Sequence, residues 1–183
     1  MKNIFIVALV SIPVIACAQQ DSSAVSLPIK NRIVFYEKEY QDNAVSKDER
    51  FDRALRWFAG AFPDSRDALN LSDKKAGKIS GTGIFRVVTG DAGSSGPARE
   101  GTYYWVKFVV AIAVTDDRCT VQAYDYYEKP TEKGVTNDYS KVEYRWHDFV
   151  RGKPWTTGDQ RLFRGLDQNT LSLMASLEKA MKR

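Results

Sequence analysis

The chain has 183 residues, of which 43% are hydrophobic, and its 27 Lys and Arg outnumber 23 Asp and Glu to give a net charge of +4. This length suits one domain with a core of its own and is short for two. The small positive excess is a weak basis for nucleic-acid binding, and a chain with two cysteines is not a disulfide-rich scaffold.

The first residues have the pattern of a bacterial signal peptide. Met1 and Lys2 are followed by an apolar run over residues 4–16, and small residues then precede polar Gln19. A charged start, a short apolar stretch and a small-residue cleavage site are typical of export signals. The run is shorter than the roughly 20 apolar residues that a membrane-spanning helix needs. We therefore expect residues 1–18 to be a signal peptide and the protein to be exported to the periplasm.

Two processing outcomes fit the same residues. Residues 16–18, Ala-Cys-Ala, satisfy the A-x-A cleavage rule, whereas residues 14–17, Val-Ile-Ala-Cys, resemble a lipobox. By resemblance to bacterial lipoproteins, removal of residues 1–16 would leave Cys17 as an acylated N-terminus anchored to the outer membrane, because several buried acyl chains hold firmly. Mass spectrometry of the mature N-terminus distinguishes a diacylated Cys17 from a free Gln19.

A polar tether is expected over residues 19–31, and a single domain over residues 32–183. The first strand is predicted at residues 32–40, because polar and apolar side chains alternate there. Ser46, followed three residues later by Glu49, matches the capping box that begins a helix. Apolar residues at helical spacing follow over residues 51–62, and Pro63 ends the helix.

Four strands are predicted next. Residues 68–72 form a short strand, and a turn at 73–77 leads to a strand over 78–89, in which Gly81 and Gly83 admit a crossing helix. Residues 102–115 form the strand with the most regular alternation. The Asp116-Asp117 turn leads to a strand over 119–127, in which the lone mature thiol, Cys119, is expected to be buried.

The last part of the chain has a less regular pattern. Residues 128–165 are predicted to be an irregular insertion with a short edge strand at 142–146. A terminal helix is then expected, with Asp167 as its cap and with Leu171, Met174 and Leu177 at helical spacing.

The order of strand, helix, four strands and helix gives an α+β fold, an antiparallel sheet with its helices on one face. The chain also resembles an exported bacterial family known only as a domain of unknown function with a TATA-binding-protein-like (TBP-like) fold. The likeness is carried by residues 51–62, by residues 77–83, and by residues 104–118 with their Asp-Asp turn. It covers about residues 32–128 with the terminal helix, and it implies a fold and no catalytic residue.

The residues that most often carry catalysis are scarce. His147, next to Asp148, is the one histidine of the sequence, and we interpret it as a surface residue. The sequence contains no H-E-x-x-H, C-x-x-C or calcium-loop spacing, so we expect no metal and no other cofactor. We expect the protein not to be an enzyme. The alternative is an envelope hydrolase or lyase that acts through carboxylates far apart in the sequence.

Aromatic and basic residues gather on the sheet face that is expected to lie opposite the helices. Alternation places there Tyr36, Lys38, Tyr40, Lys78, Arg86, Tyr103, Trp105, Lys107, Tyr124 and Tyr126. Aromatic rings with cationic neighbours suit stacking, cation–π contacts and protein interfaces.

The leading hypothesis is therefore a non-enzymatic binding or assembly module of the cell envelope that recognises a protein or a glycan through this face. Nucleic acid is not an expected partner, and the membrane is contacted only through a lipid on Cys17. Two other interpretations remain open at this stage. In one, residues 128–165 fold over this face and bury it as a second core. In the other, the face joins two copies of the chain in a purely structural dimer.

Overall fold

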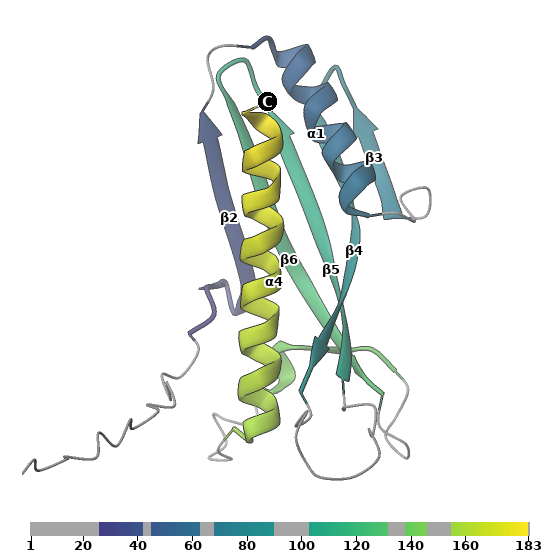
Figure 1. Ribbon diagram of the computed structural model, residues 1–183, viewed down its shortest axis with the longest axis vertical. Helices are drawn as coiled ribbons and strands as arrows, with labels where there is room; N and C mark the ends of the chain where they lie inside the picture. Colours follow the sequence, from purple (N-terminus) through teal and green to yellow (C-terminus); the bar gives the residue numbers. More distant parts are fainter. Residues whose placement is uncertain are drawn as a thin grey trace, which may run out of the picture.

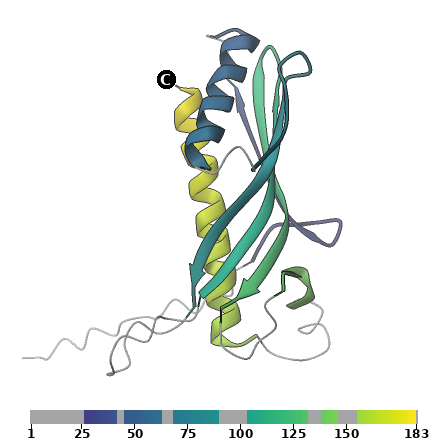
Figure 2. The ribbon, with the colours of Figure 1, turned by 90° about the vertical axis from the view of Figure 1, so that its right-hand side faces the viewer.

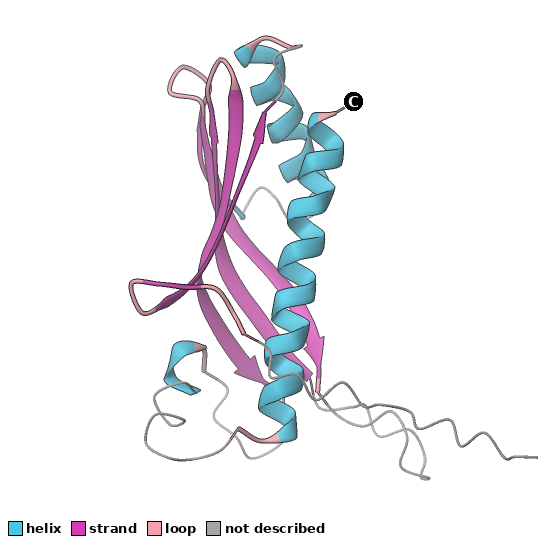
Figure 3. Cartoon of the chain, turned by 90° about the vertical axis from the view of Figure 1, so that its left-hand side faces the viewer, coloured by secondary structure: helices cyan, strands magenta, loops and turns pink. Residues whose placement is uncertain are grey.

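A computed structural model describes residues 26–41, 45–62, 68–89, 103–131, 138–145 and 155–182. One antiparallel sheet is covered on a single face by two long helices, α1 and α4 (Figures 1, 2 and 3). The predicted α+β class and the predicted order of strand, helix, four strands and helix are confirmed. No helix among the described residues is both long and apolar enough to cross a membrane.

The sheet has seven strands in the order β1-β2-β6-β5-β4-β3, with β7 beside β6. Their neighbours pair antiparallel throughout. In chain order the elements are β1 (Ile29–Lys30), β2 (Ile33–Gln41), α1 (Lys47–Ala61), β3 (Leu69–Asp73), β4 (Lys78–Val88), β5 (Tyr103–Val114), β6 (Arg118–Pro130), β7 (Ser140–Lys141) and α4 (Thr157–Met181).

Helix α1 begins after Ser46 and packs as predicted, but it forms only the serine half of the capping box, because the Glu49 carboxylate binds Arg53 and Arg56. The Ser46 hydroxyl accepts a hydrogen bond from the backbone N–H of Glu49 at 3.3 Å, which satisfies one of the free donors of the first turn. The helix lies over the glycines of β4: a Cβ atom at Gly81 would come within 2.4 Å of the Phe58 ring, and one at Gly83 within 2.8 Å of the Phe62 ring. The predicted crossing helix on these glycines is confirmed.

Helix α4 begins ten residues before the predicted cap, so the prediction of Asp167 as its start is wrong. The true N-cap is Thr156, whose hydroxyl accepts from the Asp159 N–H at 3.1 Å while the Asp159 carboxylate accepts from the Thr156 N–H at 2.9 Å. The third position after the cap holds Asp where the usual capping box has Glu or Gln. Most of residues 156–165 therefore belong to α4, and the insertion is correspondingly shorter.

A row of polar contacts, which we name the tyrosine seam, holds α4 on the sheet. Its members on α4 recur at three- and four-residue spacing and so lie on one face of the helix. The seam consists of Tyr36 to Asp167 (2.8 Å), Tyr126 to Thr170 (2.9 Å), Tyr40 to the carbonyl of Met174 (2.7 Å) and Lys38 to Glu178 (2.8 Å). The three phenol rings are buried. Each ring thus contributes apolar area to the core, while its hydroxyl forms a hydrogen bond with α4.

A β-bulge in β6 reverses the alternation of that strand. The register with β5 shifts between Lys107 and Val109, which oppose Tyr127 and Tyr124 respectively. Asp125 has a φ of 56°, in the left-handed region that a bulge residue often adopts. Because one extra residue is inserted, Tyr124 faces away from the helices whereas Tyr126 faces them.

The described part of the insertion lies at the sheet edge. Strand β7 pairs with residues 127–128 of β6, beyond the stretch that pairs with β2. The edge strand expected at residues 142–146 is wrong for its described residues, because the edge strand is β7 and residues 143–145 are helical. Val142 is buried in the core. Arg145 donates to the buried carboxylate of Glu128 at 2.7 Å and also pairs with Asp159. This ion-pair network joins the insertion to the first turn of α4.

Two buried residues, Arg50 and Cys119, lie near the turn between β5 and β6. Arg50 of α1 is 1% exposed and donates to the carbonyls of Thr115 and Asp116 at 2.7 and 3.0 Å, which anchors the predicted turn between β5 and β6. Cys119 is buried as expected, and burial raises the pKa of its thiol to about 12. Such a thiol is a small core side chain.

Gly165 tests the packing of α4 on β4. A Cβ atom there would lie 2.4 Å from Cγ1 of Val87, whereas one at Gly158, in the first turn of α4, would meet nothing closer than 3.6 Å. We expect Gly165→Ala to lower the free energy of unfolding by about 1–2 kcal/mol, because overpacking outweighs the gain in helix propensity. Gly158→Ala is the matched control and should be neutral or stabilising. Urea unfolding measures both, and an unchanged or raised stability of Gly165→Ala would contradict this packing.

Candidate functional site: the open face of the sheet

The sheet face opposite the helices carries a cluster of aromatic, aliphatic and basic side chains where β4, β5 and β6 run side by side. Pairing across the strands brings its members together, because residues directly opposite each other in antiparallel strands share a face. We name this cluster the open-face patch. It comprises Ile84, Arg86, Val88, Tyr103, Trp105, Lys107, Tyr127, Lys129 and Tyr139.

Two rows of side chains cross the patch. In the first, Arg86 of β4 is opposite Trp105 of β5, which is opposite Lys129 of β6. In the next, Lys107 of β5 lies between Ile84 and Tyr127. Each row therefore sets an aromatic ring beside a cation.

Cations lie over the aromatic rings of the patch. The Arg86 guanidinium is 5.1 Å from the centre of the Tyr103 ring, and the Lys107 and Lys129 ammonium groups lie 5.9 and 5.7 Å from the Tyr139 ring. Tyr103 in turn meets Trp105 edge to face, with ring centres 5.7 Å apart. Cation–π contacts at exposed positions contribute about 0.5–1 kcal/mol each, so they orient these rings while leaving them accessible.

The apolar members of the patch are unusually exposed for their size. Ile84 and Val88 are 52% and 53% exposed, Trp105 is 38% exposed and Tyr139 is 40% exposed. Single exposed apolar residues need no explanation, but a contiguous group rimmed by polar side chains is typical of an interaction site. The patch has this composition.

A hollow of about 410 Å³ adjoins the patch at the β6 bulge. Lys107, Tyr127 and Tyr139 of the patch line it together with Asp125. Asp125 pairs with Lys141 at 3.3 Å, an exposed ion pair of little energetic weight. The bulge therefore adds a polar recess to the edge of an otherwise aromatic and basic surface.

The comparisons with known proteins agree on the architecture that presents this patch. A family model described as a domain of unknown function (DUF4468) with TBP-like fold matches residues 36–128. The chain belongs to this family. The resemblance noted in the sequence is thereby confirmed, and the DUF4468 match covers β2 to β6, including most of the open-face patch. No curated protein matched the chain.

Two solved structures share the DUF4468 fold. One is a DUF4468 family protein from Bacteroides ovatus, with a TM-score of 0.68 and 17% identity over 86% of this chain and 91% of that chain. The other is a TBP-like protein from Parabacteroides distasonis, with a TM-score of 0.67 and 18% identity over 85% of this chain and 97% of that chain. At these identities the likeness establishes the fold alone.

Six of the ten residues that alternation assigned to this face lie on the open face of this DUF4468 domain. Arg86, Tyr103, Trp105 and Lys107 are in the patch. Tyr124 is on the same face but farther along β6, where it stacks on Phe35 with ring centres 6.0 Å apart. Lys78, which alternation also placed on this face, is exposed at the start of β4 and, with Tyr124, lines a second hollow of about 280 Å³.

Tyr36, Lys38 and Tyr40 lie on the helix side of β2, so their assignment to the open face is wrong. The alternation correctly grouped them with Val34, which is fully buried. Alternation divides the side chains of β2 between two faces, but it does not say which of the two faces the helices. In the structure, the hydroxyls of Tyr36 and Tyr40 donate hydrogen bonds to α4. Burial raises the pKa of both phenols, so they remain protonated core groups.

Tyr126 is also misassigned, for a different reason. It is fully buried and its ring stacks on Phe108 at 5.3 Å, because the bulge at Asp125 turns it toward the helices. The same bulge brings Tyr127 and Lys129 to the open face, where sequence alternation did not place them. The local sequence has no clear signal for this bulge, so sequence alternation could not place Tyr127 and Lys129 on the open face.

Two other patch members, Ile84 and Val88, could have been predicted from the sequence. The alternation that placed Arg86 on the open face places Ile84 and Val88 there as well, but their lack of polar atoms made them unremarkable. Tyr139 had no such signal, since it precedes β7 in the insertion and its position depends on tertiary packing. Cys17 and His147 lie outside the described residues.

Neighbouring cations hold the carboxyl groups of Glu49, Asp117 and Glu178 ionised, because they lower the pKa of each. Hydrogen bonds from Lys182 and Lys38 lower the pKa of Glu178 to about 2, and one from Arg118 lowers the pKa of Asp117 to about 2. A general acid at neutral pH needs a raised pKa instead. Within the described ranges, no three His, Cys, Asp or Glu side chains form a group that could hold a metal.

The neighbours Tyr126 and Tyr127 provide a matched test of the two faces. Tyr126→Phe removes the buried hydrogen bond to Thr170 and should lower the free energy of unfolding by about 1 kcal/mol. Tyr127→Phe, on the open face, should change it by less than about 0.5 kcal/mol. Urea unfolding of the two variants would measure both changes in the free energy of unfolding. If Tyr127→Phe lowered the free energy of unfolding more than Tyr126→Phe does, the bulge would be misplaced.

Proposed function

We propose that this protein is a non-enzymatic binding or assembly module of the bacterial cell envelope, and that the open-face patch is its contact surface. The observation that carries the proposal is the group of exposed apolar side chains set among cations, with Trp105 at its centre and Ile84 and Val88 beside it. Aromatic residues and Arg are the types enriched in interface cores and hot spots. A protein or glycan of the envelope is the proposed partner.

Export is part of the same proposal and rests on the leader. The pattern of residues 1–18 supports delivery to the periplasm, or to the outer membrane if Cys17 is acylated. The basic rim of Arg86, Lys107 and Lys129 favours a partner that carries acidic groups beside apolar or ring surfaces.

The partner's contact is tested by a photo-crosslinking amino acid at Ile84, on the patch, and separately at Leu171 of α4. Both side chains are 52% exposed, so the pair is matched for access. We expect a discrete envelope species to crosslink in cells from position 84 and not from position 171. Adding Trp105→Ala should weaken that crosslink strongly, since hot-spot truncations cost about 2 kcal/mol or more.

The control for the second mutation is Tyr124→Ala, on the same face but outside the patch, which should leave the crosslink at position 84 intact. Equal crosslinks from positions 84 and 171, or a crosslink unaffected by Trp105→Ala, would contradict the proposal. A crosslink between two copies of the chain would favour the structural dimer instead.

A further inference from the structure

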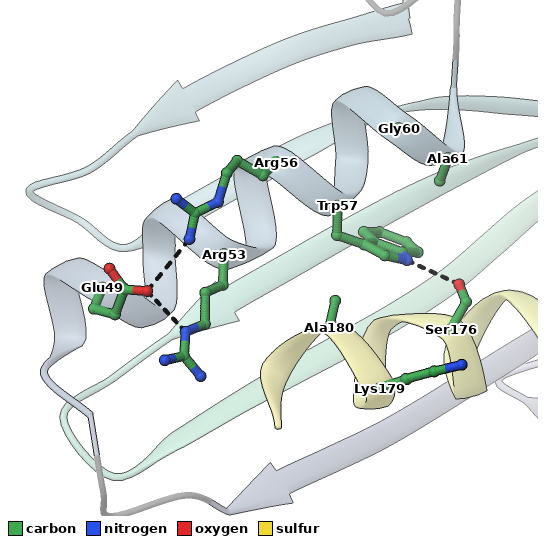
Figure 4. A pocket seen from close by; sticks show the side chains of 9 residues that line it. All are labelled: Glu49, Arg53, Arg56, Trp57, Gly60, Ala61, Ser176, Lys179 and Ala180. Atoms are coloured by element: carbon green, nitrogen blue, oxygen red, sulfur yellow. Dashed lines mark hydrogen bonds and ion pairs between the residues drawn. The ribbon is translucent and has the colours of Figure 1, made fainter. Parts of the chain in front are cut away.

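A second surface feature lies on the helix layer and is independent of the open-face patch. A groove of about 650 Å³ runs between α1 and α4 and is lined by residues of these helices (Figure 4). On α1 the lining residues recur at three- and four-residue spacing, so one helix face forms the wall. This volume lies within the range of about 300–1,000 Å³ that small-molecule sites occupy.

Gly60 keeps this groove open at a cost to the helix. Glycine near the end of a helix interior is less stable than alanine by up to about 1 kcal/mol. A Cβ atom at Gly60 would meet no atom of the described residues within 4 Å, and the φ of Gly60 is not positive, so neither the described packing nor the backbone conformation requires glycine there. By contrast, Gly81, Gly83 and Gly165 are each in close contact with neighbouring atoms. The lack of a side chain at Gly60 therefore leaves space in the groove without closing any contact among the described residues.

Trp57 forms a rigid wall of the groove. Its ring is 9% exposed and packs edge to face on Phe58 and Phe62, with ring centres 6.4 and 6.1 Å away. The indole N–H donates to the Ser176 hydroxyl of α4 at 2.8 Å, a bond drawn in Figure 4. With Ala61 and Ala180 also in the lining, the groove has an apolar floor of fixed shape.

Cations predominate around this floor. Arg53, Arg56 and Lys179 line the groove, and Glu49 is the one acid among the described residues of the lining. The Glu49 carboxylate is shared between Arg53 at 2.8 Å and Arg56 at 3.3 Å, so it balances at most one of the three positive charges. The Arg56 side chain is 69% exposed and points toward Glu49 at one end of the groove, whereas the exposed Lys179 points toward the other end, near Ser176 (Figure 4).

We propose that the α1–α4 groove binds an amphiphilic organic anion. Its carboxylate or phosphate headgroup pairs with Arg56, at the end of the groove that Arg53 also lines, and its hydrocarbon part lies over Gly60, Ala61 and Ala180 against the Trp57 ring. The charge excess selects an anion over a neutral or cationic amphiphile, and the apolar floor selects an amphiphile over a free inorganic ion.

The test uses decanoate and decyl phosphate as anionic probes, with decyl maltoside and decyltrimethylammonium as neutral and cationic analogues of the same chain length. Binding is followed by the indole N–H resonance of Trp57, assigned through Trp57→Phe, and by calorimetry. We expect both anions to shift this resonance saturably, because the headgroup chemistry is shared, whereas the other two probes do not. Binding of one anion alone identifies which headgroup the site prefers and supports the proposal.

Gly60→Leu is the decisive variant, because it fills the groove at a position where the fold has room. It should raise the melting temperature while weakening decanoate binding by about tenfold or more. Arg56→Gln is a second variant at an exposed site and should weaken binding by about two- to fivefold, with Arg56→Lys retaining most of it. Trp105→Ala, on the open-face patch, should leave decanoate binding unchanged.

Three results would overturn this proposal without affecting the proposed function of the patch. They are equal binding of the neutral, cationic and anionic probes, undiminished binding to Gly60→Leu, and no saturable shift of the Trp57 resonance with either anion.

Discussion

The tyrosine seam is the constraint on which the rest of this structure depends. Phenol rings on β2 and β6 fill the core and hydrogen-bond a single face of α4, so the helix has one position on the sheet. A buried phenol hydroxyl without a partner would cost several kcal/mol, so these rings remain in the core only because α4 supplies a hydrogen-bond partner for each of them. Because the seam commits one face to the helices, the other face is left with its aromatic and basic side chains in solvent.

The sequence predicted the elements better than it predicted their faces. Alternation and capping located β2, α1, β4 and β5, and Gly81 and Gly83 correctly indicated the crossing helix. Tyrosine is amphipathic, so the pattern of β2 did not say whether Tyr36 and Tyr40 face helix or water. In β6 the face of Tyr126 was predicted wrongly, because it depends on the bulge at Asp125, and this bulge forms through pairing with β5, which the sequence of β6 alone does not reveal. The regular hairpin of β4 and β5 has no such bulge, and its contribution to the patch was predicted correctly.

The two proposed surfaces lie on opposite layers of the molecule and differ in character. The open-face patch is broad and rich in aromatic rings and cations, as protein and glycan contacts are. The α1–α4 groove is narrower and is kept open by a glycine that the packing does not require. Helices α1 and α4 thus have two roles: they cover the core face of the sheet, and their own outer surface forms a second recess.

Hydroxyl-radical footprinting of the folded protein, read by mass spectrometry, tests the central claim most directly, because it reports the exposure of individual aromatic side chains. The structure predicts rapid modification of Trp105 and Tyr139 and strong protection of Tyr36, Tyr40 and Tyr126, which are at most 8% exposed. Protection of Trp105 together with modification of Tyr126 or Tyr40 would contradict the account, since it would mean that the helices, or the insertion, cover the other face of the sheet.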